Sequence, residues 1–187
     1  MTHNPDSSKL IVGDAVDAAI ESDMLNGVYA YWKSLLRDGG LPSRVDIEPW
    51  KIPNYLPFVN LVDVYWVDET TRRYRHRLLG TELVERFRES TDEWFDEVYT
   101  AEHLAAQLQA YDLAATTHEA NLDTVIVVTQ GATGMFETVY RRLMMPLASD
   151  GEQVDVLFLV FEFEQYDPDF HGRLSLHRPF MQRNEAR

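Results

Sequence analysis

The chain has 187 residues, a formal net charge of −14 and no cysteine. Its length suits one domain with extensions and is sufficient for a hydrophobic core. The lack of cysteine excludes disulfides, thiolate catalysis, thiolate metal ligands and cysteinyl–flavin photochemistry. The acidic charge argues against nucleic acid as a partner and leaves room for a basic protein.

The first part of the chain is expected to form one amphipathic helix. Residues 1–13 are polar, and Asp14 can cap a helix. Apolar side chains then recur every three or four positions, at Ile20, Met24, Val28, Trp32 and Leu35. Gly27 interrupts this stripe and allows a break there, and Gly39 and Gly40 end the helix.

Nothing at the start of the chain has the basic and apolar segments of a signal peptide. No window approaches the roughly 18 apolar residues of a membrane span. We therefore expect a cytoplasmic protein without a membrane partner.

Residues 41–57 contain four prolines, which exclude a long regular element. Asp46 is expected to cap a short helical turn that has Pro49 in its first turn. Arg44 and Asp46 would then form a local ion pair that fixes this loop. The alternative is that they contact a ligand or a partner.

Two strands joined by a tight turn are expected next, at residues 58–67 and 73–79. In the second strand arginines alternate with Tyr74, His76 and Leu78, a pattern typical of a strand with one wet face. An antiparallel hairpin is the simplest arrangement of this pair.

The basic cluster of this acidic chain is Arg72-Arg73-Tyr74-Arg75-His76-Arg77. The net charge argues against a nucleic-acid site. We expect these arginines to make cross-strand ion pairs on the wet face, and the alternative is a docking point for an acidic partner.

The remaining elements are a run of helices followed by three strands. Helices are expected at residues 81–87 and 101–117, and Trp94, Phe95 and Val98 mark a short packed segment between them. The strands are expected at residues 122–129, 135–147 and 154–163. Thr100 can cap the longest helix, and Asp150-Gly151 is a strong hairpin signal.

The last strand is apolar on both faces, so both faces must be covered. Helices cover one face. The other face needs the N-terminal helix, a second subunit, or both, and we expect a homodimer that forms through the sheet face and the N-terminal helix. The alternative is a monomer in which the helix alone covers that face.

Three motifs resemble the small bacterial PAS-like domain family. They are L-P-S-R-x-D-I-x-P at residues 41–49, R-x-R-L-x-G-T at residues 75–81, and R-x-L-x-x-P-L-x-x-D-G, which ends at Gly151. Family members often carry a glycine after their first helix, where this chain reads Glu89-Ser90-Thr91-Asp92-Glu93-Trp94, so the geometry of that loop is open.

The resemblance implies an α+β fold: a PAS-like five-stranded antiparallel sheet with helices on one face and an N-terminal amphipathic helix on or near the other. It divides the chain into an N-terminal extension (1–40), the PAS-like domain (41–165) and a C-terminal extension (166–187). The helices between the second and third strands would cover a cavity.

Three polar side chains are candidates for ligand contacts in that cavity: Asn60, His76 and Tyr140. A polar atom on such a face needs a partner or costs roughly 1–3 kcal/mol. A small-molecule ligand is one partner, and a backbone carbonyl or water is another. For His76 the open alternatives are a satisfied core histidine, a ligand contact, and metal or haem ligation.

No metal or cofactor is assigned from the sequence. No second histidine stands at usable ligand spacing from His76. Haem-binding PAS domains use a helix histidine, for which His103 and His118 are the nearest candidates. A flavin is not supported either, because the chain has neither a cysteine for an adduct nor a phosphate-binding glycine loop. The glycines at 131 and 134 suit a turn better than a dinucleotide-binding fingerprint.

By resemblance, the function is a sensory, ligand-binding or protein-interaction module in bacterial signalling, with no attached output domain. No nucleophile motif is present, and no enzyme is expected. The alternative is a small enzyme of the ketosteroid-isomerase-like class with His76 as general base beside Asp63 or Glu137. A third hypothesis is a pure interaction module without a cavity of roughly 300 Å³ or more.

Overall fold

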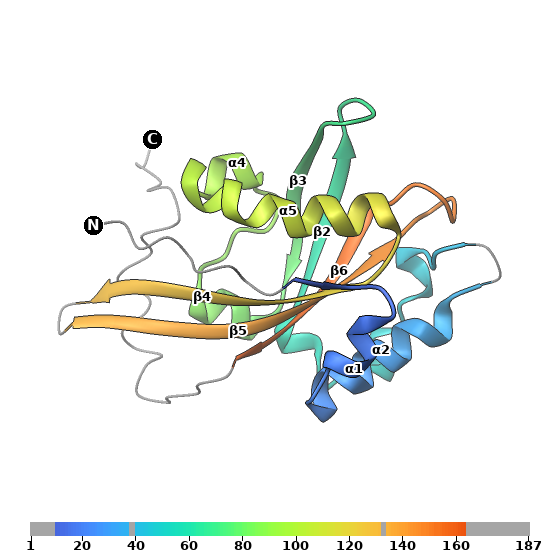
Figure 1. The fold of residues 1–187 in the computed structure, drawn as a ribbon, viewed down its shortest axis with the longest axis horizontal. Helices are drawn as coiled ribbons and strands as arrows, with labels where there is room; N and C mark the ends of the chain where they lie inside the picture. Colours follow the sequence, from blue (N-terminus) through green and yellow to red (C-terminus); the bar gives the residue numbers. More distant parts are fainter. Residues whose placement is uncertain (1–9, 38–39, 132–133, 164–187) are drawn as a thin grey trace.

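The computed structural model describes residues 10–37, 40–131 and 134–163, and around the 132–133 gap it describes only the backbone of residues 127–131 and 134–137. These residues form one antiparallel sheet, in the strand order β1-β4-β5-β6-β2-β3, with helices on both faces (Figure 1). Its strands are β1 (Ile11–Val12), β2 (Val59–Trp66), β3 (Arg72–Leu79), β4 (Asn121–Gly131), β5 (Gly134–Leu147) and β6 (Val156–Phe163).

The described part of the sheet has six strands, where five were predicted. The extra strand is β1, which pairs Ile11 with Leu122 and Val12 with Asn121. Gly13 follows with a φ of 64° and donates its N–H to the carbonyl of Ala120 at 2.9 Å. Two residues are too short to show a period, so only the tertiary structure reveals this strand.

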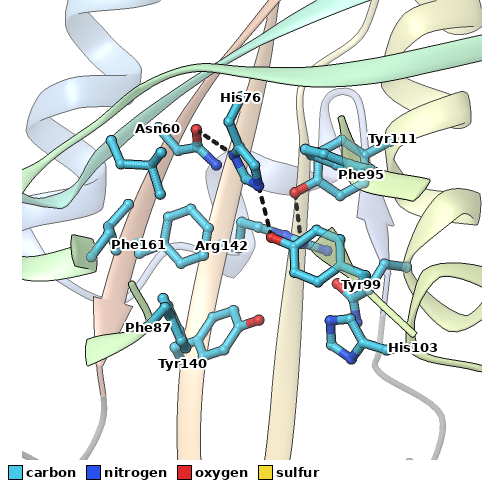
Figure 2. Close-up of a pocket in the computed structure, with 13 residues that line it drawn as sticks. Asn60, His76, Phe87, Phe95, Tyr99, His103, Tyr111, Tyr140, Arg142 and Phe161 are labelled. Atoms are coloured by element: carbon cyan, nitrogen blue, oxygen red, sulfur yellow. Dashed lines mark hydrogen bonds between the residues drawn. The ribbon is translucent and has the colours of Figure 1, made fainter. Parts of the chain in front are cut away.

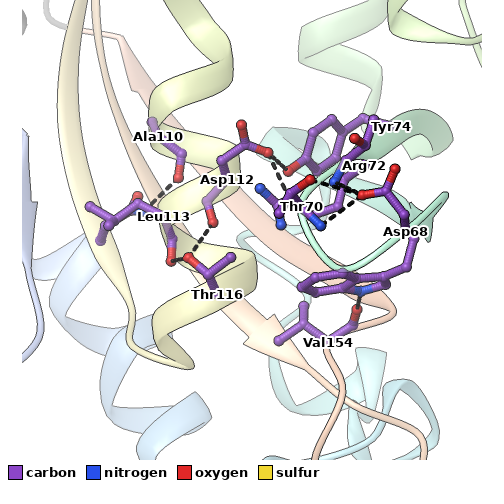
Figure 3. A network of polar contacts seen from close by, with 12 residues as sticks. Asp68, Thr70, Arg72, Tyr74, Ala110, Asp112, Leu113, Thr116 and Val154 are labelled. Atoms are coloured by element: carbon purple, nitrogen blue, oxygen red, sulfur yellow. Dashed lines mark hydrogen bonds and ion pairs between the residues drawn. The ribbon is translucent and has the colours of Figure 1, made fainter.

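Three helices cover the inner face of the sheet: α3 (Thr81–Arg86), α4 (Phe95–Val98) and α5 (Ala101–Thr117). The predicted cap of α5 is confirmed, because the hydroxyl of Thr100 accepts the N–H of His103 at 3.3 Å. Asp112 of α5 ties the helix to β3, since its carboxylate accepts the Tyr74 hydroxyl at 2.6 Å and Arg72 Nε at 2.9 Å (Figure 3).

The single N-terminal helix that was predicted is not what the structure shows. Two helices, α1 (Ala15–Ala19) and α2 (Asp23–Leu35), are separated by extended backbone at Ile20. The hydroxyl of Ser22 starts α2 by accepting the N–H of Leu25. The break therefore lies before Gly27, which is inside α2, and α2 ends before Gly40.

These two helices lie on the face opposite α5. Neighbouring residues of a strand point to opposite faces, and Arg141 donates to the carbonyl of Ala19 whereas Arg142 donates to Tyr111 of α5. Trp32 of α2 donates its indole N–H to the carbonyl of Pro146 at 3.2 Å.

The outer face of β5 and β6 is therefore covered within the chain. Four of its apolar side chains are at most 1% exposed: Leu143, Met145, Phe158 and Val160. The burial that motivated a homodimer through the sheet face and N-terminal helix is thus supplied by α2 at these two strands.

The proline-rich segment forms short 3₁₀ turns, among them Arg44–Asp46 and Pro49–Lys51. Asp46 does not cap the second turn as predicted. Its carboxylate instead accepts the N–H of Ser43 at 2.8 Å and pairs with Arg37 at 2.7 Å. The predicted Arg44–Asp46 pair is thus replaced by an Arg37–Asp46 pair.

No helix among the described residues is both long and apolar enough to cross a membrane. The C-terminal extension predicted at residues 166–187 lies outside the described residues.

Candidate functional site

A small cavity lies between the inner face of the sheet and the helices α3, α4 and α5 (Figure 2). Its volume is about 30 Å³, which is room for about two water molecules. The lining residues are Asn60, His76, Leu79, Leu83, Phe87, Phe95, Tyr99, His103, Gln107, Tyr111, Tyr140, Arg142 and Phe161.

The structure brings all three predicted site residues, Asn60, His76 and Tyr140, to this cavity. The prediction that Leu78 shares a face of β3 with Tyr74 and His76 is wrong. The β2–β3 register shifts between Leu61 and Val62, so that these residues oppose Leu78 and His76 and leave one residue of β3 bulged. The bulge turns Leu78 outward, where it is 41% exposed, and brings the next residue, Leu79, to the cavity instead.

His76 is fully hydrogen-bonded as a neutral imidazole. Its Nδ1 lies 3.4 Å from Oδ1 of Asn60 and its Nε2 lies 2.9 Å from the hydroxyl of Tyr99. The Asn60 oxygen is an acceptor, so Nδ1 donates and Nε2 accepts from Tyr99. Burial, with a smaller contribution from Arg88, lowers the pKa of His76 from 6.5 to about 3.

Replacing His76 with glutamine should flatten the acid side of the stability profile. The unfolded chain protonates this histidine near pH 6.5 whereas the fold keeps it neutral to about pH 3. Between these values the unfolded state binds more protons than the folded state. The contribution of His76 to the free energy of unfolding is therefore fully present above pH 6.5, and it falls by about 1.4 kcal/mol per pH unit as the pH drops toward 3. His76→Gln should remove this part of the slope.

Urea unfolding of both chains at pH 7 and pH 5 measures the difference, because the carboxylates contribute equally to both. His118→Gln is the matched control, since His118 is exposed at the end of α5. Equal slopes for wild type and His76→Gln would contradict the neutral, buried assignment.

A buried ion pair forms the floor of the cavity beside Tyr140. Arg142 donates Nε and Nη2 to the two carboxylate oxygens of Asp123, at 3.1 Å and 2.6 Å, and Nη1 to the Tyr111 hydroxyl at 3.1 Å. Both charged side chains are only 3% exposed. Burial alone would lower the pKa of Arg142, but the Asp123 carboxylate and the nearby Tyr111 and Tyr140 raise it overall.

Arg142 was missed as a site residue, although the sequence carried a signal for it. Tyr140 was predicted as a site residue, and Arg142 lies two positions further along the same strand, which places it on the same face. Tyr99 gave no such signal, because it precedes α5 outside any periodic segment.

Two polar groups of the lining are open to further contacts. The side-chain oxygen Oε1 of Gln107 is buried without a hydrogen-bond partner in the described structure. The Tyr140 hydroxyl, in a ring packed against Phe87 and Phe161, makes no hydrogen bond among the described residues (Figure 2). Either group could bond a small polar molecule.

Of the two alternative histidines considered for haem, His103 lines the cavity and His118 is exposed. The carboxylates considered for enzyme chemistry are not seen beside His76. Asp63 accepts from Arg75 and Arg77 on the outer face, away from His76, and the side chain of Glu137 lies outside the described part. Among the described residues, no group of three or more His, Asp or Glu could hold a metal ion.

The outer face of β2 and β3 carries a second polar cluster. The expected cross-strand ion pairs are confirmed for Arg75 and Arg77, which pair with Asp63 of β2 at 2.8 Å and 2.9 Å. Arg72 and Arg73 pair instead with helices, Arg72 with Asp112 of α5 and Arg73 with Asp96 of α4. The guanidinium carbon of Arg73 lies 4.1 Å from the ring centroid of Trp94. The ring of Tyr65 also packs against Trp94, and Tyr65 is 41% exposed.

Compared with known protein families, residues 20–160 match the PAS domain. No curated protein and no solved structure matches the chain.

Proposed function

The chain belongs to the PAS domain family, and from this we propose that it is a sensory or protein-interaction module of bacterial signalling that acts through its surface. The observation that supports this function most directly is the filled interior. A site for a drug-sized molecule is usually at least about 300 Å³, whereas the cavity beneath α5 has about 30 Å³.

The polar residues of the interior also bind one another rather than pointing at an empty site. His76 makes hydrogen bonds with Asn60 and Tyr99, and Arg142 donates hydrogen bonds to Asp123 and Tyr111. This arrangement favours a rigid core. A signal would then be read on the surface, for which the exposed outer face of β2 and β3 with Tyr65 and Arg73 is available to a protein partner.

A second function, sensing of a small molecule in the cavity, is favoured by the unpartnered Oε1 of Gln107 and by the open Tyr140 hydroxyl. The molecule would be polar and of a few heavy atoms, unless the helices move apart. Such a ligand can switch the surface only by its different affinity for two conformations.

Native mass spectrometry of freshly purified protein, compared with its denatured mass, separates the two functions. We expect each subunit to carry no organic molecule beyond the mass of the chain. A bound molecule would contradict the filled-core proposal, and Tyr140→Phe should then reduce its occupancy while the control Tyr65→Phe, on the exposed outer face, should not.

A further inference from the structure

The two charged residues of the motif at residues 41–49 that were expected to pair have different surroundings. Asp46 is used within the fold, because its carboxylate accepts the N–H of Ser43 and pairs with Arg37. Arg44 is half-buried and makes no ion pair with a described residue, and its Nε is buried without a hydrogen-bond partner. The contact with a partner, which was left open for both residues, is therefore still open for Arg44.

The positive charge of Arg44 is not balanced within the proline-rich segment. The carboxylates of this segment are those of Asp46 and Glu48. Each has a cation of its own, since Asp46 pairs with Arg37 and Glu48 pairs with Lys51. The guanidinium of Arg44 is left over, and a carboxylate from outside can supply the charge-assisted hydrogen bonds that it lacks.

Two apolar side chains near Arg44 in the chain are held in solvent. Val45 is 83% exposed and Trp50 is 71% exposed, the highest values among the large apolar side chains of the described residues. Tryptophan and arginine are enriched at the centres of protein interfaces. Six positions separate Arg44 from Trp50, which is at most roughly 21 Å along the chain, so one interface of ordinary size, about 800 Å² per partner, can include both.

The turns that carry these side chains are anchored in the core. Ile47 and Ile52, which follow the two 3₁₀ turns, are 6% and 2% exposed. Tyr31 of α2 holds the backbone between the turns, because its hydroxyl accepts the N–H of Glu48 at 2.8 Å. A surface that is ordered before it binds loses little conformational entropy on binding.

We propose that Arg44, Val45 and Trp50, which we call the motif surface, bind a segment of another protein that carries a carboxylate beside apolar side chains. The carboxylate pairs with the guanidinium of Arg44, and the apolar side chains cover Val45 and Trp50. This assignment rests on the proposed function, because it names the class of partner for a module that acts through its surface. The motif surface is distinct from the outer face of β2 and β3, which carries Tyr65 and Arg73.

Acrylamide quenching of tryptophan fluorescence in the full chain tests whether the motif surface is uncovered. Trp32 is 3% exposed, and Trp66 and Trp94 are only partly exposed, so Trp50 should supply most of the quenchable emission. We expect the quenching constant to fall in Trp50→Phe and to be retained in the control Trp94→Phe. Equal constants in wild type and Trp50→Phe would mean that another part of the chain or a second copy covers Trp50, which would overturn the proposal.

The chemistry of the partner is tested with a phage-displayed library of random peptides, selected on the immobilised full chain. We expect the selected peptides to share an aspartate or glutamate beside apolar residues. A synthetic peptide of that sequence should bind Arg44→Gln and Trp50→Ala about tenfold or more weakly than wild type in fluorescence anisotropy titrations. The matched controls Arg73→Gln and Tyr65→Ala, on the outer face of β2 and β3, should change the affinity by less than about twofold.

A charge reversal shows whether the acidic residue of the peptide contacts Arg44 itself. Arg44→Glu should lose the selected peptide and should bind the peptide in which lysine replaces the acidic residue, because opposite charges then face each other again. Circular dichroism checks that each variant is folded, which is expected because Val45 and Trp50 are exposed and Arg44 has no ion pair to lose among the described residues.

The proposal is overturned if no peptide is enriched, if the enriched peptides lack an acidic residue, or if Arg44→Gln binds them as wild type does. Loss of binding in Arg73→Gln and Tyr65→Ala alone would move the partner to the outer face of β2 and β3. That result would overturn the motif surface and leave the proposed function standing, whereas an organic molecule carried by the purified chain would contradict the proposed function itself.

Discussion

Replacement of Asp123 by alanine should destabilise the fold by about 3–5 kcal/mol and lower its melting temperature by roughly 10 °C. The variant leaves the guanidinium of Arg142 buried, with only the Tyr111 hydroxyl of its present partners. A buried charge without its counterion loses most of the attraction that offset its desolvation. Thermal and urea unfolding of wild type and variant measure the loss.

Two controls show whether the cost comes from the stranded charge. Removing both charges in Asp123→Leu/Arg142→Met should restore most of the stability, because an apolar pair of similar volume needs no desolvation. Asp17→Ala breaks the exposed Lys33–Asp17 pair, whose side chains are 37% and 53% exposed, and should cost only about 0–1 kcal/mol. A loss as small for Asp123→Ala would mean that water reaches Arg142.

Gly80→Ala should also destabilise the fold, by about 1–3 kcal/mol or more, because overpacking forces the backbone to shift. Gly80 is the N-cap residue of α3, and a methyl group there would overlap the backbone carbonyl oxygens of Leu56 and Pro57. The position is held in place, since Gly80 donates its N–H to the carbonyl of Val59 at 2.7 Å. Urea unfolding at pH 7 measures the effect.

Gly27→Ala is the matched control for Gly80→Ala. A methyl group at Gly27 meets only the hydroxyl end of the Tyr55 side chain, which can rotate away. The substitution also gains about 1 kcal/mol of helix propensity inside α2, so we expect a net change within about 1 kcal/mol. Equal destabilisation by both variants would show that the close approach at Gly80 is not what requires glycine.

Local patterns in the sequence were sufficient to predict most of the elements, and the family resemblance implied the cavity beneath the helices. The alternation in the second strand assigned His76 and Tyr74 to one face, and the cap at Thr100 located the start of α5. Both predictions are confirmed, because side-chain period and capping depend on residues a few positions apart. Asn60 and Tyr140, which were predicted as ligand contacts in the cavity, also line it.

The features that the sequence could not supply depend on contacts between distant residues. The β2–β3 bulge, which exchanges Leu78 for Leu79 at the cavity, is a choice of register between two strands. The pairing of β1 with β4 joins residues more than one hundred positions apart, and neither choice leaves a periodic trace.

The amino-acid sequence by itself determined the family, the α+β class and the shared strand face of Tyr74 and His76, because each follows from short motifs or a local period. Only the tertiary structure decided that the outer face of β5 and β6 is covered by α2, that Arg142 is neutralised by Asp123, and that the cavity holds about 30 Å³. The physical reason is that cavity volume and charge pairing depend on how helices and strands pack against one another. That packing is not determined by a residue's neighbours in the chain.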